Sequence, residues 1–162
     1  MKKLATFQLF LMMLGSFCLS SSPLHAAEKQ SGLSKGQLVY VPAYSHIYSG
    51  DQERPFLLTV TLSIRNIDPN HSVNITLADY YETQGKLLKK FVENPTILKP
   101  LESLRYVIPE RDKSGGSGAN FLVKWHSDAH VNPPIVETIM IGTQNQQGLS
   151  FTSRGQEVLP SR

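Results

Sequence analysis

The segment FLLTVTLSIRN, residues 56–66, alternates between apolar and polar side chains more clearly than any other part of the sequence. In an extended strand, successive side chains point to opposite faces, so an alternating pattern separates into two sets. The apolar set is Phe56, Leu58, Val60, Leu62 and Ile64, and the polar set is Thr59, Thr61, Ser63 and Arg65. One buried face and one hydrated face are typical of a strand in an antiparallel sheet. This segment therefore predicts an antiparallel β-protein.

Similar strand signals recur along the chain, separated by clusters of Gly, Pro, Asn and Asp. Thr83-Gln84-Gly85 predicts a hairpin turn into a strand at 86–92, unless residues 87–91 form one helical turn instead. The nearly continuous apolar run at 135–141 predicts a central strand covered on both faces. Further strands are expected at 73–81, 97–98, 104–108, 121–125 and 149–151. Because no helical pattern separates them, we predict an all-β fold, an immunoglobulin-like antiparallel β-sandwich of about seven to eight strands.

The length of 162 residues fits one domain, expected at 37–156. A flexible entry segment is predicted at 28–36 and a frayed tail at 157–162.

Residues 1–27 have the layout of a secretory signal peptide. Lys2 and Lys3 precede an apolar stretch at 4–19, and a Ser/Pro break leads to Ala26 and Ala27. Cleavage after either alanine is compatible with the pattern. An uncleaved anchor is disfavoured because the apolar run falls short of the ~20 residues that span a bilayer. We therefore expect the leader to be removed and the protein to be periplasmic or secreted.

Cys18 is the single cysteine of the chain, and it lies in this leader. A lipoprotein would carry a small residue just before its acylated cysteine, whereas Phe17 stands there, so we expect no membrane anchor after signal removal. The mature chain would then contain no cysteine. That excludes thiol catalysis, thiolate metal sites and disulfides, and leaves the core alone to hold the fold.

The positive charge of the chain lies mostly in the same leader. Of the 16 basic residues, Lys2 and Lys3 belong to it, which leaves 14 against 13 acidic residues, a net charge of about +1. The basic isoelectric point therefore gives no reason to expect a nucleic-acid partner.

An aromatic row marks residues 38–48, LVYVPAYSHIY, as a candidate binding strand. Tyr40, Pro42, Tyr44, His46 and Tyr48 would share one face of this strand, and Val41, Ala43, Ser45 and Ile47 the other. If the second set is buried, the row offers stacking surface with polar tips, suited to a glycan or another protein. In the alternative, the tyrosines are the buried set. Because Pro42 donates no backbone hydrogen bond, we also expect an edge strand that a partner peptide could extend.

A glycine loop, Gly115-Gly116-Ser117-Gly118, followed by Asn120, completes the candidate binding surface. Ala119 stands where a nucleophile elbow needs glycine, and the expected helix is missing, so Ser117 is not read as that motif. The loop could present backbone N–H groups that bind an anion or a carboxylate. Alternatively, the glycines simply allow a hairpin and close contact with a sheet.

Two further groups of residues contain side chains capable of chemistry. His126 and His130 lie four residues apart, ~13 Å along a straight strand, which is too far for one metal ion, so a charged loop end is the simpler interpretation. Glu137 shares a face with Ile135, Ile139 and Ile141. If that face is buried, Glu137 needs a partner such as Arg65, Arg105 or Arg154, and if the opposite face is the core, it is simply hydrated. No catalytic site, metal or cofactor is predicted.

Three long segments resemble a bacterial family catalogued as domain of unknown function 3124. They are VPAYSHIYSGDQERPFLLTVTLSIRN at 41–66, DKSGGSGANFLVKW at 112–125 and IMIGTQNQQGLSFTSRG at 139–155. The resemblance extends over residues 35–155 and implies small exported proteins without an assigned activity. It supplies no catalytic residues.

The function expected from the sequence is a non-enzymatic binding or assembly module of the bacterial envelope, with a peptide, glycan or protein partner. Two alternatives stay open. One is a hydrolase that combines His46 or His126 with Ser117, and the other is a structural accessory without a small ligand.

Overall fold

The computed structural model describes residues 32–48, 53–144 and 147–159. Most of these residues form strands, and none of them forms a helix, so no described segment is a helix able to cross a membrane. The predicted leader, with Cys18, and the last three residues of the predicted tail lie outside the described residues. The described strands belong to one compact unit, Gly32–Arg162.

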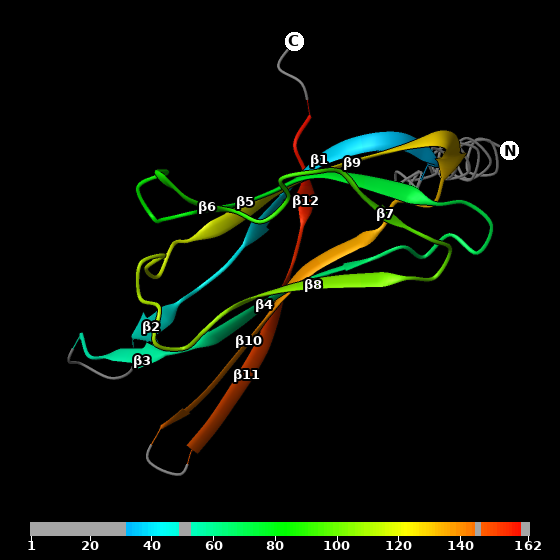
Figure 1. Cartoon of the computed structure of the whole chain (residues 1–162). Coiled ribbons are helices and arrows are strands. Elements are labelled where there is room, and N and C mark those ends of the chain that lie inside the picture. Colours follow the sequence, from blue (N-terminus) through cyan, green and yellow to red (C-terminus); the bar gives the residue numbers. More distant parts are fainter. Residues whose placement is uncertain (1–31, 49–52, 145–146, 160–162) are drawn as a thin grey trace, which may run out of the picture. The chain divides into compact units, whose positions relative to one another are not determined.

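Twelve strands appear in the described ranges, labelled in Figure 1. They are β1 (Ser34–Pro42), β2 (His46–Tyr48), β3 (Pro55–Leu57), β4 (Thr59–Arg65), β5 (Val73–Tyr81), β6 (Leu87–Lys90), β7 (Thr96–Leu98), β8 (Ser103–Ile108), β9 (Asn120–Val131), β10 (Ile135–Gln144), β11 (Gln147–Arg154) and β12 (Gln156–Glu157).

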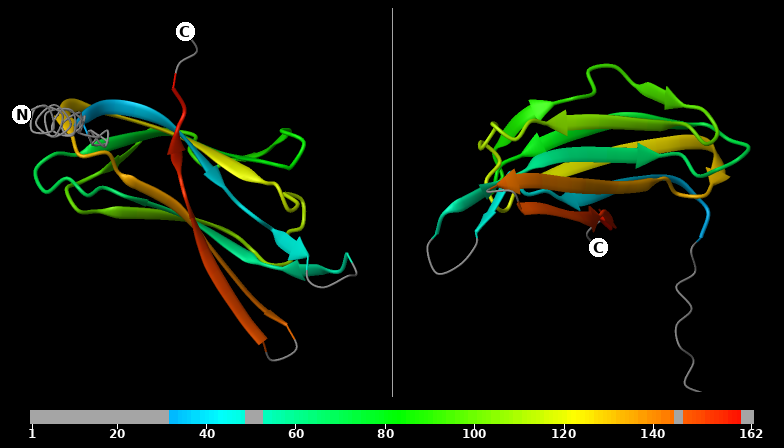
Figure 2. Two further views of the ribbon diagram at one scale, coloured as in Figure 1. Left: turned by 180° about the vertical axis from the view of Figure 1, so that it is seen from behind. Right: turned by 90° about the horizontal axis from the view of Figure 1, so that it is seen from below.

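The strands form two principal antiparallel sheets that lie as layers (Figures 1 and 2). The six-stranded sheet has the order β12-β1-β9-β5-β6, with β7 also pairing with β5. The four-stranded sheet has the order β11-β10-β4-β8, and β2 and β3 form a separate ribbon. The predicted antiparallel β-sandwich is confirmed, with more strands than expected because several are only two to four residues long.

The core lies between the two sheets and contains four of the five apolar residues of the opening segment, while Phe56 on β3 is partly buried and packs against it. Leu58, Val60, Leu62 and Ile64 are fully buried, as the alternation predicted. Across from β4, the six-stranded sheet contributes the buried side chains of Phe121, Val123 and Trp125 on β9, also as predicted. Complete burial of such large side chains supplies ~1.5–3 kcal/mol each, which makes this interior the main source of stability.

Sheet neighbours are distant in sequence because the chain repeatedly crosses between layers. β1 pairs with β9, where Val39 lies opposite Val123, and β4 pairs with β10, where Val60 lies opposite Met140. One local prediction is confirmed as well: Gly85, with a φ of 83°, forms the hairpin turn into strand β6.

Both expected boundaries of the domain differ from the structure. Strand β1 starts at Ser34, inside the predicted entry segment. The tail is not frayed at its start, because Gln156 and Glu157 pair with β1 and the Val158 N–H donates to the Leu38 carbonyl. Strand β1 therefore lies between β9 and β12 and is not an edge strand along Val39–Tyr40, whereas Pro42 lies beyond the short β12.

Two strand interpretations were wrong. Residues 126–130 are not a loop end, because β9 continues to Val131 with His126, Asp128 and His130 exposed and the small residues between them half-buried. Strand β10 is buried on one face rather than two. Its core side is Val136, Thr138 and Met140, while Ile141 on the other side is half exposed. The apolar run was misleading because isoleucines also lie on the outer face.

Candidate functional site

The structure separates the predicted site residues into several places. Tyr40 and Asn120 lie on the outer face of the six-stranded sheet. Tyr44 is half-buried, with its ring centroid 5.8 Å from that of Phe151. His46 and Tyr48 lie on β2, with Nε2 and the hydroxyl 3.3 Å apart. The single strand expected at 38–48 is interrupted, because β1 ends at Pro42 and β2 begins at His46.

The opposite set on this segment faces the core, as one of the two alternatives proposed. Val41, Ala43 and Ser45 are fully buried, and Ile47 packs against the core. The Ala43 N–H donates to the Ala119 carbonyl, which holds this non-strand segment against the start of β9. Small side chains let the segment pass under the glycine loop.

The glycine loop is packed onto other parts of the domain. The Gly116 N–H donates to the buried Ser45 hydroxyl at 2.9 Å, and the Gly118 N–H donates to the Thr83 hydroxyl at 3.0 Å. Gly116 has a φ of 79°, which favours glycine. The anion-binding hypothesis fails for these two N–H groups because both already donate within the protein. Close sheet contact is the interpretation that the geometry favours.

The hydrolase alternative finds no matching geometry in the described ranges. There, His46 hydrogen-bonds Tyr48 and His126 lies 3.4 Å from the Asn74 amide, while neither is paired with Ser117. No group of three or more His, Cys, Asp or Glu side chains is placed to hold a metal ion among the described residues.

The outer face of the six-stranded sheet carries the best candidate site. In register across four strands, Tyr40 on β1 lies beside Leu122 on β9, then Asp79 on β5, then Lys90 on β6. The next row on this face places Asn120 between Pro42 and Tyr81. Residues opposite one another in adjacent antiparallel strands share a face. We call Tyr40, Asp79, Tyr81, Asn120 and Leu122 the tyrosine face.

Asp79 is the unusual residue of the tyrosine face. It is 6% exposed, and within the described part of the chain its carboxylate makes no hydrogen bond and no ion pair, even with the adjacent Lys90. Its carboxylate oxygens still reach the solvent. Burying a carboxylate without a partner is costly, so such groups usually have one. Asp79 is thus an acceptor that an external donor can reach.

Sequence reasoning identified Tyr40 and Asn120 but missed Asp79 and Tyr81. A signal was present, because Asp79 interrupts the apolar and aromatic run of β5 between Ala78 and Tyr80. Its burial, however, depends on Leu122 and Lys90, which distant segments bring beside it.

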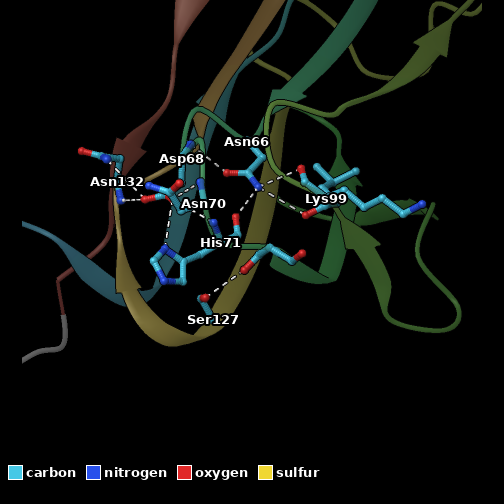
Figure 3. Close-up of polar contacts among 9 residues, drawn as sticks. Asn66, Asp68, Asn70, His71, Lys99, Ser127 and Asn132 are labelled. Atoms are coloured by element: carbon cyan, nitrogen blue, oxygen red, sulfur yellow. Dashed lines mark hydrogen bonds and ion pairs between the residues drawn. The ribbon is translucent and has the colours of Figure 1, made fainter.

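A second polar cluster joins loops at one end of the sandwich (Figure 3). Asn66 is 2% exposed, and its side-chain amide donates to the carbonyls of His71, Leu98 and Lys99. Its side-chain carbonyl accepts the Asp68 N–H at 3.0 Å. One side chain therefore ties together the loop after β4 and the turn after β7.

Asp68 extends this cluster to the loop after β9. Its Oδ1 accepts from the N–H groups of Asn70 and His71 and lies 3.1 Å from His71 Nδ1, and its Oδ2 accepts from the backbone and amide of Asn132. These donors, led by the Asn70 and Asn132 N–H groups, hold the pKa of the Asp68 carboxyl far below its ordinary value of 3.8. Asp68 is saturated with internal partners, so the cluster is a structural clasp.

The pKa of Asp68 predicts an acid-dependent loss of stability. Because the folded pKa is depressed, the stabilising contribution is complete above about pH 4 and is lost as the pH falls further toward the folded pKa. We expect Asp68→Asn to be less stable than the wild type at pH 6 and to lose less stability between pH 4 and pH 2. Urea unfolding across this range measures both slopes. Parallel slopes would contradict the assignment.

Comparison with known proteins identifies the family of the chain, and that family has no described function. No curated protein matches the chain. A crystal structure of Thermotoga maritima 1070 is similar with a TM-score of 0.44 and 12% identity, covering 74% of this chain and 92% of that one. The model of the family described as "Protein of unknown function (DUF3124)" matches residues 36–158. The chain therefore belongs to this family.

Proposed function

We propose that the protein is an exported, non-enzymatic binding module of the bacterial envelope that recognises a glycan through the tyrosine face. The observation that carries the proposal is Asp79, a residue 6% exposed whose carboxylate has no partner among the described residues and which lies on β5, between β9 and β6. Tyr40, 40% exposed, provides an accessible ring next to Leu122 in the same row. The face therefore combines stacking surface with an unused hydrogen-bond acceptor.

The charges around Asp79 favour hydroxyl donors over a cationic ligand. Lys90 lies directly beside it on β6, and Lys124 projects from the same side of β9, two residues from Leu122. These ammonium groups raise the local potential and disfavour a ligand lysine or arginine. Neutral sugar hydroxyls can donate to the carboxylate, while the Asn120 amide offers both a donor and an acceptor. Tyrosine rings supply flat, amphipathic surface for sugar rings.

Export is part of the proposal and is supported by the sequence of residues 1–27. A charged start, an apolar stretch and two alanines have the order found in cleaved leaders. An envelope location would also bring the tyrosine face into contact with cell-wall and surface glycans.

Substitutions on the tyrosine face test the function. We expect Asp79→Ala and Tyr40→Ala each to weaken binding of neutral envelope oligosaccharides at least tenfold, which corresponds to about 1.4 kcal/mol. The loss follows because the first removes the acceptor and the second the stacking surface. Isothermal titration calorimetry measures the affinity, and thermal melting confirms that each variant is folded.

Asp128→Ala is the matched control, because Asp128 is an exposed aspartate on β9 outside the tyrosine face. We expect this variant to bind as the wild type does. Equal affinity of the Asp79→Ala variant and the wild type, or an equal loss in the Asp128→Ala variant, would disprove the proposed site.

A further inference from the structure

The outer face of the four-stranded sheet, on the other layer of the sandwich, contains a groove of about 280 Å³. Arg65 on β4 and Arg105 on β8 line it, together with the hydroxyl groups of Thr61 and Ser63 and the side chain of Ile139 on β10. Its volume is below that of a typical enclosed ligand pocket and suits one side chain of an extended ligand.

The charges on this face are unbalanced. In register across the sheet, Arg105 lies beside Ser63, Ser63 beside Glu137, and Glu137 beside Arg154. Three arginines, counting Arg65, therefore share the face with one carboxylate. Arg65 Nε donates to the Ser63 hydroxyl at 3.1 Å and lies 3.8 Å from Glu137 Oε1. Arg105 has no ion pair among the described residues, so its guanidinium is available.

The sequence left two alternatives for Glu137: a buried carboxylate with an arginine partner, or a hydrated one with the core on the opposite face of β10. The structure has part of each. The core takes the opposite face of β10, yet the Glu137 side chain is 17% exposed and has Arg65 as its partner. The pair neutralises one side of the groove and leaves the Arg105 side positive.

Apolar side chains adjoin the arginines on the same face. Thr61 lies between Val107, 45% exposed, and Ile139, and in the next row Ile141, 50% exposed, lies between Thr59 and Ser150. Branched aliphatic side chains match the apolar side chains of a peptide and offer no stacking plane for a sugar. A guanidinium fork matches a carboxylate in geometry as well as charge.

We infer that this groove is a second binding site, which holds a carboxylate side chain of an acidic, partly apolar peptide segment. Arg105 binds the carboxylate with help from the Ser63 hydroxyl, and Ile139, Val107 and Ile141 contact the neighbouring apolar side chains. The site is independent of the tyrosine face, because the two lie on outer faces of different sheets.

Fluorescence anisotropy with a labelled peptide of alternating glutamate and leucine tests the inference. We expect Arg105→Gln to weaken binding of this peptide at least tenfold at 0.15 M salt. Arg65→Gln should weaken it less, because Glu137 already neutralises part of the Arg65 charge. A peptide in which glutamine replaces glutamate should bind at least tenfold more weakly than the acidic one.

Two controls keep the outcome specific. Arg111→Gln removes an exposed arginine outside the groove and should leave peptide affinity unchanged. Asp79→Ala should also leave it unchanged, so failure of the tyrosine face and failure of the groove are told apart. Unchanged affinity in the Arg105→Gln variant, equal binding of the glutamine peptide, or Arg105-dependent binding of acidic oligosaccharides in place of the peptide would overturn the inference.

Discussion

Replacing Gly115 with alanine is expected to destabilise the folded protein by about 2–3 kcal/mol, the upper range for overpacking a filled interior. A Cβ at this position would overlap the Tyr80 hydroxyl and lie 2.7 Å from Tyr80 Cζ. The Tyr80 ring cannot easily move away, because it is fully buried and its centroid lies 4.8 Å from that of Phe121. Chemical denaturation measures the loss.

Gly148→Ala is the matched control for this substitution. A Cβ on Gly148 would meet nothing within 4 Å, so this variant should unfold like the wild type. If the Gly115 and Gly148 variants unfolded alike, the close packing of the loop on Tyr80 would be wrong.

Tyr80→Phe in the Gly115→Ala background tests the mechanism of that loss. The Tyr80 hydroxyl is buried without a hydrogen-bond partner among the described residues, and burial, with the charge of Asp112, raises its pKa to about 12. Removing it relieves the closest overlap, although Cζ remains. We therefore expect partial rescue, seen as a favourable coupling energy in a double-mutant cycle.

Asn66→Ala is the second large effect expected, a loss of about 2–4 kcal/mol in the free energy of unfolding. The substitution removes a buried amide that serves three backbone carbonyls and one N–H group. The Leu98 carbonyl lies deepest of the three, so water replaces the lost donor least well there. Urea denaturation gives the free energy directly.

Asn70→Ala is its control, because Asn70 lies in the same loop but its exposed side chain makes no hydrogen bond within the described ranges. A change below about 0.5 kcal/mol is expected there, as for ordinary surface positions. A comparably small change in the Asn66→Ala variant would show that the loops hold together without this clasp.

The fold was predictable where the alternation of apolar and polar residues along a strand matched the burial of its two faces in the folded protein. The alternating residues of β4, and Phe121, Val123 and Trp125 on β9, were each predicted to have one buried face. Both predictions were right, because each strand packs against the opposite sheet on one side only. Strand β10 was misjudged because Ile139 and Ile141 line an outer face, where burial depends on neighbouring strands. Local sequence does not contain that information.

The candidate site was predictable only in part, for a related reason. Tyr40 and Asn120 were identified as surface candidates, and the structure places both on one face. The other members lie elsewhere: Tyr44 packs beside Phe151 of the other sheet, His46 and Tyr48 belong to the β2–β3 ribbon, and Gly115 of the glycine loop packs against Tyr80. The burial of Asp79 depends on its cross-strand neighbours Lys90 and Leu122, which are 11 and 43 positions away in the sequence.

Backbone amide chemical shifts of the purified protein, recorded during titration with neutral envelope oligosaccharides, test the central claim most directly. We expect saturable shift changes concentrated at Tyr40, Asp79, Asn120 and Leu122, with the outer face of the four-stranded sheet unaffected. Shift changes confined to other parts of the domain, or none at millimolar sugar, would contradict glycan recognition by the tyrosine face.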